Sequence, residues 1–115
     1  MDKDCIFCRI IDGEIPCSMV YQDEKVLVFK DINPLAPVHV LIVSKQHIES
    51  AQELNESSSE IAAHIFGKIP GIAKELGIAE SGYRVVTNIG KDGGQAVPHL
   101  HFHILGGRKL ENALG

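Results

Sequence analysis

The sequence predicts an α+β domain built around an antiparallel sheet. Apolar, β-rich segments of strand length lie on both sides of one central segment with helical periodicity. Short polar turns join neighbouring strand segments, as in antiparallel hairpins. The 115 residues contain no repeat, low-complexity tract or linker. We therefore expect a single domain over residues 1–115, since this length is typical of one folding unit.

The N-terminal part predicts one helical turn followed by a hairpin. Residues 5–12 (CIFCRIID) have the pattern of a short helical turn, which Gly13 closes. Residues 19–21 and the stronger candidate 26–29 read as strands, and the polar residues 22–25 form the turn between them. This arrangement predicts an antiparallel pair.

Three further strands are expected. Two prolines stiffen a loop over residues 31–37, and residues 38–43 are apolar on both faces, which is typical of a central strand. Residues 83–87 form another strand. A glycine-rich loop over residues 88–94 then leads into the last strand, which carries the histidines of residues 98–105.

The middle of the chain predicts a helix. Serines at residues 57–59 offer N-cap hydroxyls, and Gly77 is the expected C-terminal stop. Pro70 and Gly71 interrupt the pattern, so a kink or break is expected there; a helix that continues through proline loses about 3 kcal/mol. One apolar stripe recurs at three- and four-residue steps and consists of Ile61, Ile65, Ile69, Ile72 and Leu76.

Composition excludes several classes of protein. A net charge of −4 argues against a dedicated nucleic-acid binder, which normally has a basic face. No apolar run is long enough for a membrane span, and the first residues lack the apolar core of a signal peptide, so we expect a cytoplasmic protein. Three cysteines do not form a disulfide framework. Cys5 and Cys8 form a C-x-x-C motif, which indicates metal or redox chemistry, whereas Cys17 is expected to be passive.

Three of the six histidines alternate with apolar residues in the segment HLHFHI at residues 99–104. On a strand, His99, His101 and His103 would share one face, and the apolar residues would share the other. The polar face has three interpretations: a purely structural one, metal binding, or a nucleophile. Metal binding by all three is disfavoured because in-line neighbours on a strand lie about 7 Å apart.

The nucleophile interpretation follows from imidazole chemistry. With a pKa near 6.5, imidazole is mostly the free base at neutral pH. Two positive charges about 7 Å apart repel by about 2 kcal/mol at an effective dielectric of 20, which lowers a pKa by more than one unit. His101 has a histidine on both sides and is the expected covalent nucleophile. The glycine-rich segment at residues 90–95 turns amides toward an anion, which favours phosphate chemistry.

These motifs resemble the histidine-triad (HIT) family. The segment PHLHFHIL at residues 98–105 resembles its His-φ-His-φ-His-φ-φ signature, where φ is apolar. Further motifs resemble the Hint branch, the purine nucleoside phosphoramidases. They are CIFCRII (residues 5–11) with EIP (14–16), FKDINP (29–34), APVHVLIV (36–43), Asn88 with GGQ (93–95), and GGR (106–108). The resemblance implies a HIT-like fold of five antiparallel strands with one long central helix and a short N-terminal helix. It also implies a homodimer.

The resemblance further implies a hydrolase that acts on purine nucleoside phosphoramidates of the AMP-amine type. His101 would attack the α-phosphorus, the amine would leave, and water would release the nucleotide from a nucleotidyl-histidine. His103 would contact the phosphate, and His39 would fix the tautomer of a triad histidine. Asp31 would hold the ribose hydroxyls. The residues implied around the nucleotide are Ile6, Phe7, Ile10, Asp31, Ile32, Asn88, Gly94, Gln95, Ala96, Val97, His101 and His103.

In some bacterial members of the family, the C-x-x-C motif holds zinc with two histidines. Here Cys5, Cys8, His47 and His99 would supply the four ligands of a closed structural site. The alternative is a pair of reduced packing cysteines, with His47 relaying protons near His39.

The sequence departs from the family pattern at two places. Many members have serine where Ala96 stands, so the proton donor to the leaving amine is open, with water or His103 as substitutes. The tail at residues 108–115 lacks the usual Trp-Pro-Pro-Gly. Two other functions stay open: a dinucleoside polyphosphate hydrolase or nucleotidyltransferase of the same family, and a nucleotide-binding interaction module with little activity.

Overall fold

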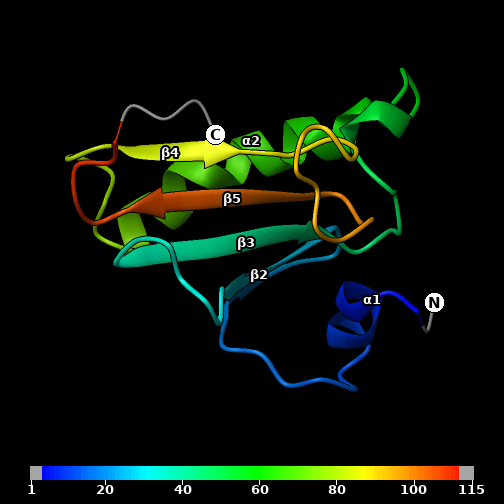
Figure 1. The fold of residues 1–115 in the computed structure, drawn as a ribbon, viewed down its shortest axis with the longest axis horizontal. Helices are drawn as coiled ribbons and strands as arrows, with labels where there is room; N and C mark the ends of the chain where they lie inside the picture. The colour runs from blue at the N-terminus through cyan, green and yellow to red at the C-terminus, as the bar shows by residue number, and fades with distance from the viewer. Residues whose placement is uncertain (1–3, 112–115) are drawn as a thin grey trace.

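A computed structural model describes residues 4–111 of the chain. Figure 1 shows β2, β3, β5 and β4 side by side, with the long helix α2 behind β4 and β5 and the short helix α1 apart from it, beyond β2. The elements in chain order are α1 (Ile6–Ile11), β1 (Met19–Gln22), β2 (Val26–Lys30), β3 (Val38–Ser44), the 3-10 turn η1 (Ala51–Glu53), α2 (Ser59–Glu75), β4 (Tyr83–Val86) and β5 (His101–Gly106).

All five strands form one sheet in the order β1-β2-β3-β5-β4, and every neighbouring pair is antiparallel. The predicted α+β class, the five-stranded sheet, the long helix and the short N-terminal helix are therefore confirmed. Among the described residues no helix is long and apolar enough to cross a membrane.

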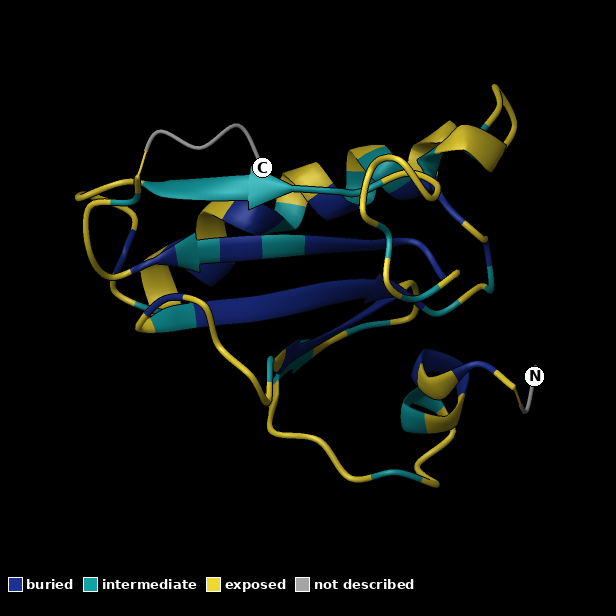
Figure 2. Ribbon diagram, in the orientation of Figure 1, coloured by how far each residue is buried: buried dark blue, intermediate teal, exposed yellow. Residues whose placement is uncertain are grey.

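The register of the two central strands assigns opposite roles to the two faces of the sheet. Ile42 pairs with Phe102, and their side chains belong to the core beneath α2. Val43 pairs with His101 and Leu41 with His103, so these four side chains share the opposite face. Phe7 of α1 packs there with Leu41 and Val43. In Figure 2 the central strands are mostly buried, whereas the edge strand β4 is only half-buried.

The histidine segment begins its strand later than the sequence predicts. β5 starts at His101, and His99 lies in the bend that precedes it. The expectation that all three histidines share one strand face is therefore wrong for His99. Here the amide of Leu100 donates to the carbonyl of Ile48, outside the sheet, at 2.6 Å. The bend turns the His99 ring toward α1 and away from the other two rings.

α2 continues through Pro70 to Glu75, so the predicted break is absent. Pro70 lies on the exposed side of the helix, where water can bond the Phe66 carbonyl that proline leaves without its helical donor. Ile69 and Ile72, on the opposite side, are buried in the core under the sheet. Tertiary packing on both sides of the proline thus holds the helix together.

His64 of α2 links the helix to the turn between β1 and β2. Its Nε2 lies 2.7 Å from Oδ2 of Asp23, which also accepts the Tyr21 hydroxyl at 2.7 Å. Oδ1 of Asp23 accepts the amides of Lys25 and Val26. This network gives His64 a structural role between α2 and the β1–β2 turn.

Gly77 ends α2 with a positive φ of 76°, as the sequence predicts. The amide of Ile78 donates to the carbonyl of Ala73 at 3.0 Å, and the amide of Gly77 donates to that of Lys74 at 3.1 Å. This pair of bonds is a Schellman motif, which requires a left-handed residue.

Gly77→Ala should lower the free energy of unfolding by about 1–2 kcal/mol, because a Cβ disfavours the left-handed conformation. Gly77→Asn should cost less, since asparagine tolerates that conformation. Urea denaturation of the two variants tests this. Equal losses for both would argue against a backbone cause.

Candidate functional site

His101 is buried at the start of β5, and its hydrogen bonding fixes one tautomer. Its Nδ1 lies 2.6 Å from the carbonyl oxygen of His99. Because a carbonyl only accepts, Nδ1 carries the proton, and Nε2 keeps its lone pair. The ring of Phe7 packs edge-on against the imidazole, with 5.0 Å between centroids. His101 is thus held as a neutral base with its nucleophilic nitrogen opposite its anchored one.

A chain of hydrogen bonds also fixes His39 and His103. The amide of Leu35 donates to Nδ1 of His39 at 3.1 Å, so Nε2 of His39 carries the proton. That Nε2 lies 3.0 Å from Nδ1 of His103, which therefore accepts. Nε2 of His103 then carries a proton and can donate to a ligand. The sequence predicted that His39 fixes a triad tautomer, but it gave no sign of the Leu35 amide that directs the chain.

Asp31 lies beside this chain. Its Oδ2 is 3.5 Å from Nε2 of His39, and its Oδ1 accepts the amide of Asn33 at 2.8 Å. A half-buried carboxylate is therefore placed next to the triad. This position accords with the ribose contact that the resemblance implies, since two hydroxyls can share one carboxylate.

Burial lowers the pKa values of the triad histidines. For His101 burial lowers the pKa below 6.5, while the bond to the His99 carbonyl and the charge of Asp31 oppose the shift. For His103 burial, followed by the charges of His101 and His39, lowers the pKa to about 4. The prediction of a lowered His101 pKa is correct in direction, but its cause is wrong, because desolvation rather than repulsion between histidines dominates.

Stability should therefore fall as the pH drops below about 6.5. A histidine with a lower pKa in the folded state binds fewer protons there than in the unfolded chain between the two pKa values. Between its two pKa values, each such histidine lowers the free energy of unfolding by up to about 1.4 kcal/mol per pH unit as the pH falls. Above pH 6.5 this penalty is absent. Urea denaturation between pH 8 and pH 4.5 measures it. His103→Asn should reduce the slope, and a free energy that is flat over this range would contradict the assignment.

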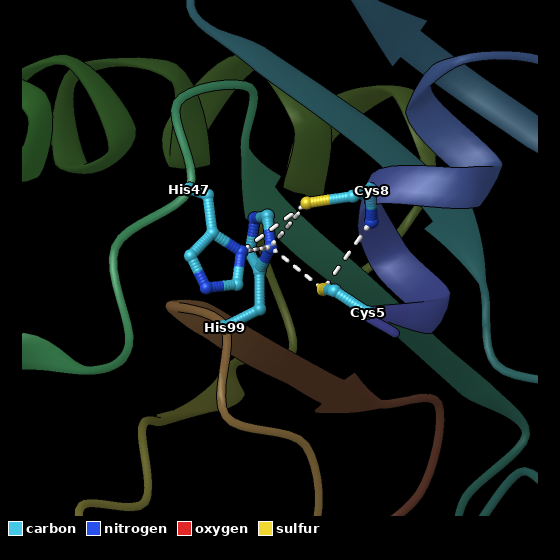
Figure 3. A group of neighbouring side chains, drawn as sticks. All are labelled: Cys5, Cys8, His47 and His99. Carbon is cyan, nitrogen blue, oxygen red and sulfur yellow. Dashed lines mark hydrogen bonds between the residues drawn. The ribbon is translucent and has the colours of Figure 1, made fainter. Parts of the chain in front are cut away.

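Four side chains, among them His99, converge at one point between α1, the loop after β3 and the bend before β5 (Figure 3). The potential ligand atoms of Cys5, Cys8, His47 and His99 all lie within 4.8 Å of one another. Nδ1 of His99 is 3.2 Å from the Cys5 sulfur and 3.1 Å from Nδ1 of His47. The sulfur of Cys8 lies 3.2 Å from Nδ1 of His47. The structure thus brings together all four predicted ligands.

The geometry of this cluster fits a tetrahedral metal. With metal–ligand bonds of about 2.0–2.3 Å, the edges of a tetrahedral site measure about 3.3–3.8 Å, close to the distances above. Nε2 of His99 lies 2.7 Å from the carbonyl of Ser44, so it carries the proton and Nδ1 presents a lone pair to the cluster. Two imidazole nitrogens 3.1 Å apart need a shared cation or proton. The Ser44 carbonyl is a contributor that the sequence did not reveal.

Part of the glycine-rich segment at residues 90–95 uses its amides for hydrogen bonds within the loop and not for a ligand. The amides of Gly94 and Gln95 donate within the loop, to the carbonyls of Lys91 and Gly90. The Gln95 side chain also bonds backbone groups, with Oε1 accepting the Gly90 amide. Within residues 4–111, the amides of Ala96 and Val97 have no hydrogen-bond partner. Two available donors therefore lie just after the glycines, directly before the histidine segment.

Close backbone approach shapes this loop. A Cβ on Gly93 would lie 2.3 Å from the carbonyl oxygen of Ile89, so only glycine fits without a shift of the chain. The Asn88 side chain donates to the Gly93 carbonyl at 2.8 Å. Asn88 thus supports the loop.

The apolar residues predicted around the nucleotide fall into two groups. Phe7, Ile10 and Val97 pack together in the apolar cluster beside His101. Ile6 and Ile32 are exposed, and Ile32 is 90% exposed. The structure places the first group around the triad, whereas an assignment of the other two requires a ligand to cover them.

Comparison with known proteins identifies the family. A family model described as the HIT domain matches residues 12–110. The chain belongs to the HIT family. A HIT-like protein of Helicobacter pylori is 48% identical over 104 residues, which cover 90% of this chain and 97% of the relative.

Solved HIT structures agree in fold as well as in sequence. A histidine triad protein from Clostridium difficile is 50% identical, with a TM-score of 0.95 and 98% of each chain covered. A HIT family hydrolase from Clostridium thermocellum is 47% identical, with a TM-score of 0.95 and 99% of each chain covered. The three histidines that give the HIT family its name separate here into two sites, with His99 at the cysteine cluster and His101 packed against His103, with 5.1 Å between their ring centroids.

Proposed function

We propose that this HIT protein is a hydrolase that cleaves the P–N bond of purine nucleoside phosphoramidates, such as AMP linked to an amine, through a covalent nucleotidyl-histidine. The observation that carries the proposal is the tautomer of His101, whose Nδ1 proton is held by the His99 carbonyl at 2.6 Å. Two similar structures are named HIT family hydrolases, which supports hydrolysis as the reaction class.

The reaction proceeds in two displacements. Nε2 of His101 attacks the α-phosphorus, a phosphorus–imidazole bond forms, and the bond from phosphorus to the amine breaks as the amine gains a proton. Water then attacks the same phosphorus. The nucleoside monophosphate leaves with the new oxygen, and the electron pair returns to Nε2 of His101.

The surrounding groups stabilise charge on the phosphate. Nε2 of His103 and the amides of Ala96 and Val97 are donors without a partner within the described chain, and they flank the nucleophile in sequence. Donors held in place before the reaction stabilise the transition state without reorganising. Ala96 has no hydroxyl, so the proton for the amine comes from water or from His103 in its protonated, imidazolium form.

We also propose that the cysteine cluster binds zinc. Two thiolates and two imidazoles at tetrahedral spacing are the donor set of a closed structural zinc site. Cys5, Cys8, His47 and His99 would hold the ion, which supplies cohesion between α1 and the histidine segment. Elemental analysis should find about one zinc per chain. Reduced thiolate ligands accord with a cytoplasmic location, which we propose on that basis.

A homodimer is the proposed assembly. β4 is an edge strand, and all four of its residues are partly exposed. Pairing or packing with a second copy would protect such an edge. Sedimentation analysis of the full chain tests this proposal.

The test of the activity compares substrate classes. The protein is incubated with an adenosine phosphoramidate and, separately, with diadenosine polyphosphates. We expect a higher kcat/KM for the adenosine phosphoramidate than for the diadenosine polyphosphates. Faster cleavage of diadenosine polyphosphates would favour the alternative reaction in the family, and binding without turnover of either would favour an interaction module.

A further inference from the structure

A cavity adjoins His39 and His103 on the β4 side of the sheet, away from α1. It has a volume of about 280 Å³, and His39, His103 and Asn88 form its inner wall. β4 supplies a further wall, since Val86 pairs with His103 and Arg84 pairs with Leu105. Phe7 and the apolar cluster lie beside His101 at the other end of this face. The reacting histidines therefore have an open cavity on one side and the packed Phe7 cluster on the other.

Two arginines border this cavity. Arg84 and Arg108 both line it, and neither forms an ion pair with any carboxylate of residues 4–111. Arg84 donates one hydrogen bond, from Nη2 to the Glu111 carbonyl at 2.7 Å. Arg108 donates to the carbonyls of Lys109 and Leu35. Each guanidinium has five N–H donors, so within one protomer most donors of both side chains are left for a ligand.

The position of Arg84 fits a group a few bonds beyond the phosphorus. Arg84 and Val86 lie on the same face of β4, about 7 Å apart along the strand. Because Val86 is opposite His103, the Arg84 side chain starts one such step from the triad and extends along the cavity. Glu111 also borders the cavity, and its backbone carbonyl, not its carboxylate, accepts the hydrogen bond from Arg84.

We infer that this cavity receives the leaving group, and that Arg84 and Arg108 select leaving amines that carry an anionic group. The inference rests on the proposed phosphoramidate hydrolysis. With the base and ribose beside Phe7 and Asp31, the leaving amine occupies the free space past His103. Leu35, Val86, Leu105 and Leu110 give this space an apolar lining that suits a short aliphatic body. Guanidinium forks bind carboxylate and phosphonate groups in the same bidentate way.

Three matched ligands test the inference: AMP linked through nitrogen to valine, to valinamide, and to the aminophosphonate analogue of valine. They share the nucleotide and the aliphatic body and differ in charge. Dissociation constants are measured in a His101→Asn background, where covalent attack is blocked and binding does not depend on turnover. We expect the valine compound to bind about 10–100-fold more tightly than the valinamide compound, as charge-assisted hydrogen bonds predict. The phosphonate compound should also bind more tightly than the valinamide compound, and its affinity relative to the valine compound tells whether carboxylate or phosphonate is the preferred anion.

Arg84→Gln, added to this background, should reduce the preference to about 3-fold or less, and Arg84→Lys should restore part of it. Arg9→Gln is the matched control. It removes the same charge from an arginine of α1, which pairs with Glu14 and does not line the cavity. Equal binding of valine and valinamide compounds, or a full preference in Arg84→Gln, would overturn the inference. Turnover of the valinamide compound by the unmodified protein tests the proposed hydrolysis separately, so the two failures are distinguishable.

Discussion

Replacing His101 with alanine should lower kcat/KM for an adenosine phosphoramidate by about 10⁴-fold or more. The variant lacks the nitrogen that forms the covalent bond, and loss of a nucleophile commonly removes most of an enzyme's rate enhancement. The fold should survive, because the neighbouring core beneath α2 does not include this side chain. Steady-state kinetics with purified variant and unmodified protein measure the effect.

His64→Ala is the matched control for this prediction. It makes the same substitution at a histidine that bonds Asp23 near the β1–β2 turn. Its kcat/KM should remain within about 3-fold of the unmodified value, although its stability falls slightly with the lost hydrogen bond. A His101→Ala variant that retains more than a tenth of the activity would show that another group attacks phosphorus.

Replacing Cys8 with alanine should remove the bound zinc and lower the free energy of unfolding by about 3 kcal/mol or more. The Cys8 side chain is fully buried, and its loss leaves His47 and His99 with facing lone pairs and no shared ion. For a domain of this length, such a loss lowers the melting temperature by about 10 °C or more. Calorimetry and elemental analysis of the same preparation measure both effects.

Cys17→Ala provides the control, because Cys17 is exposed and belongs to no cluster of potential ligands within the described residues. Its zinc content and melting temperature should match those of the unmodified protein. If Cys8→Ala also kept its melting temperature, and zinc were absent from both proteins, the cluster would be a set of reduced packing residues. Metal-free protein with normal activity would lead to the same conclusion.

Much of the fold could be predicted because the spacing of apolar residues along the chain indicates which faces of helices and strands are buried. The stripe that includes Ile61, Ile65 and Ile69 faces the core, and the apolar run of β3 is buried on both sides. Local patterns failed where tertiary contacts decide. Pro70 interrupts the helical pattern but not the helix, because neighbouring turns are fixed by packing. The start of β5 could not be inferred, because the bend at His99 depends on contacts with Ser44 and Ile48.

The same limit applies to the site. Residue types and spacing indicated the C-x-x-C motif and the nucleophile, since both depend on rare side chains placed close in sequence, whereas only the family resemblance indicated His47 and His99 as the other two ligands. The groups that orient them are backbone atoms: the Leu35 amide, the Ser44 carbonyl and the His99 carbonyl. Any residue type supplies such atoms, so the sequence carries no mark of them. The exposure of Ile32 and the internal bonding of Gln95 are likewise properties of loop geometry.

The most direct test of the account is mass spectrometry of the protein quenched in the middle of turnover. An adenosine phosphoramidate is mixed with the enzyme, the reaction is stopped within the first turnovers, and the digested protein is searched for a nucleotidyl group. The account predicts one adenylyl group on His101, formed and lost at rates compatible with kcat. Active protein that never carries the adduct, or carries it on another residue, would contradict it.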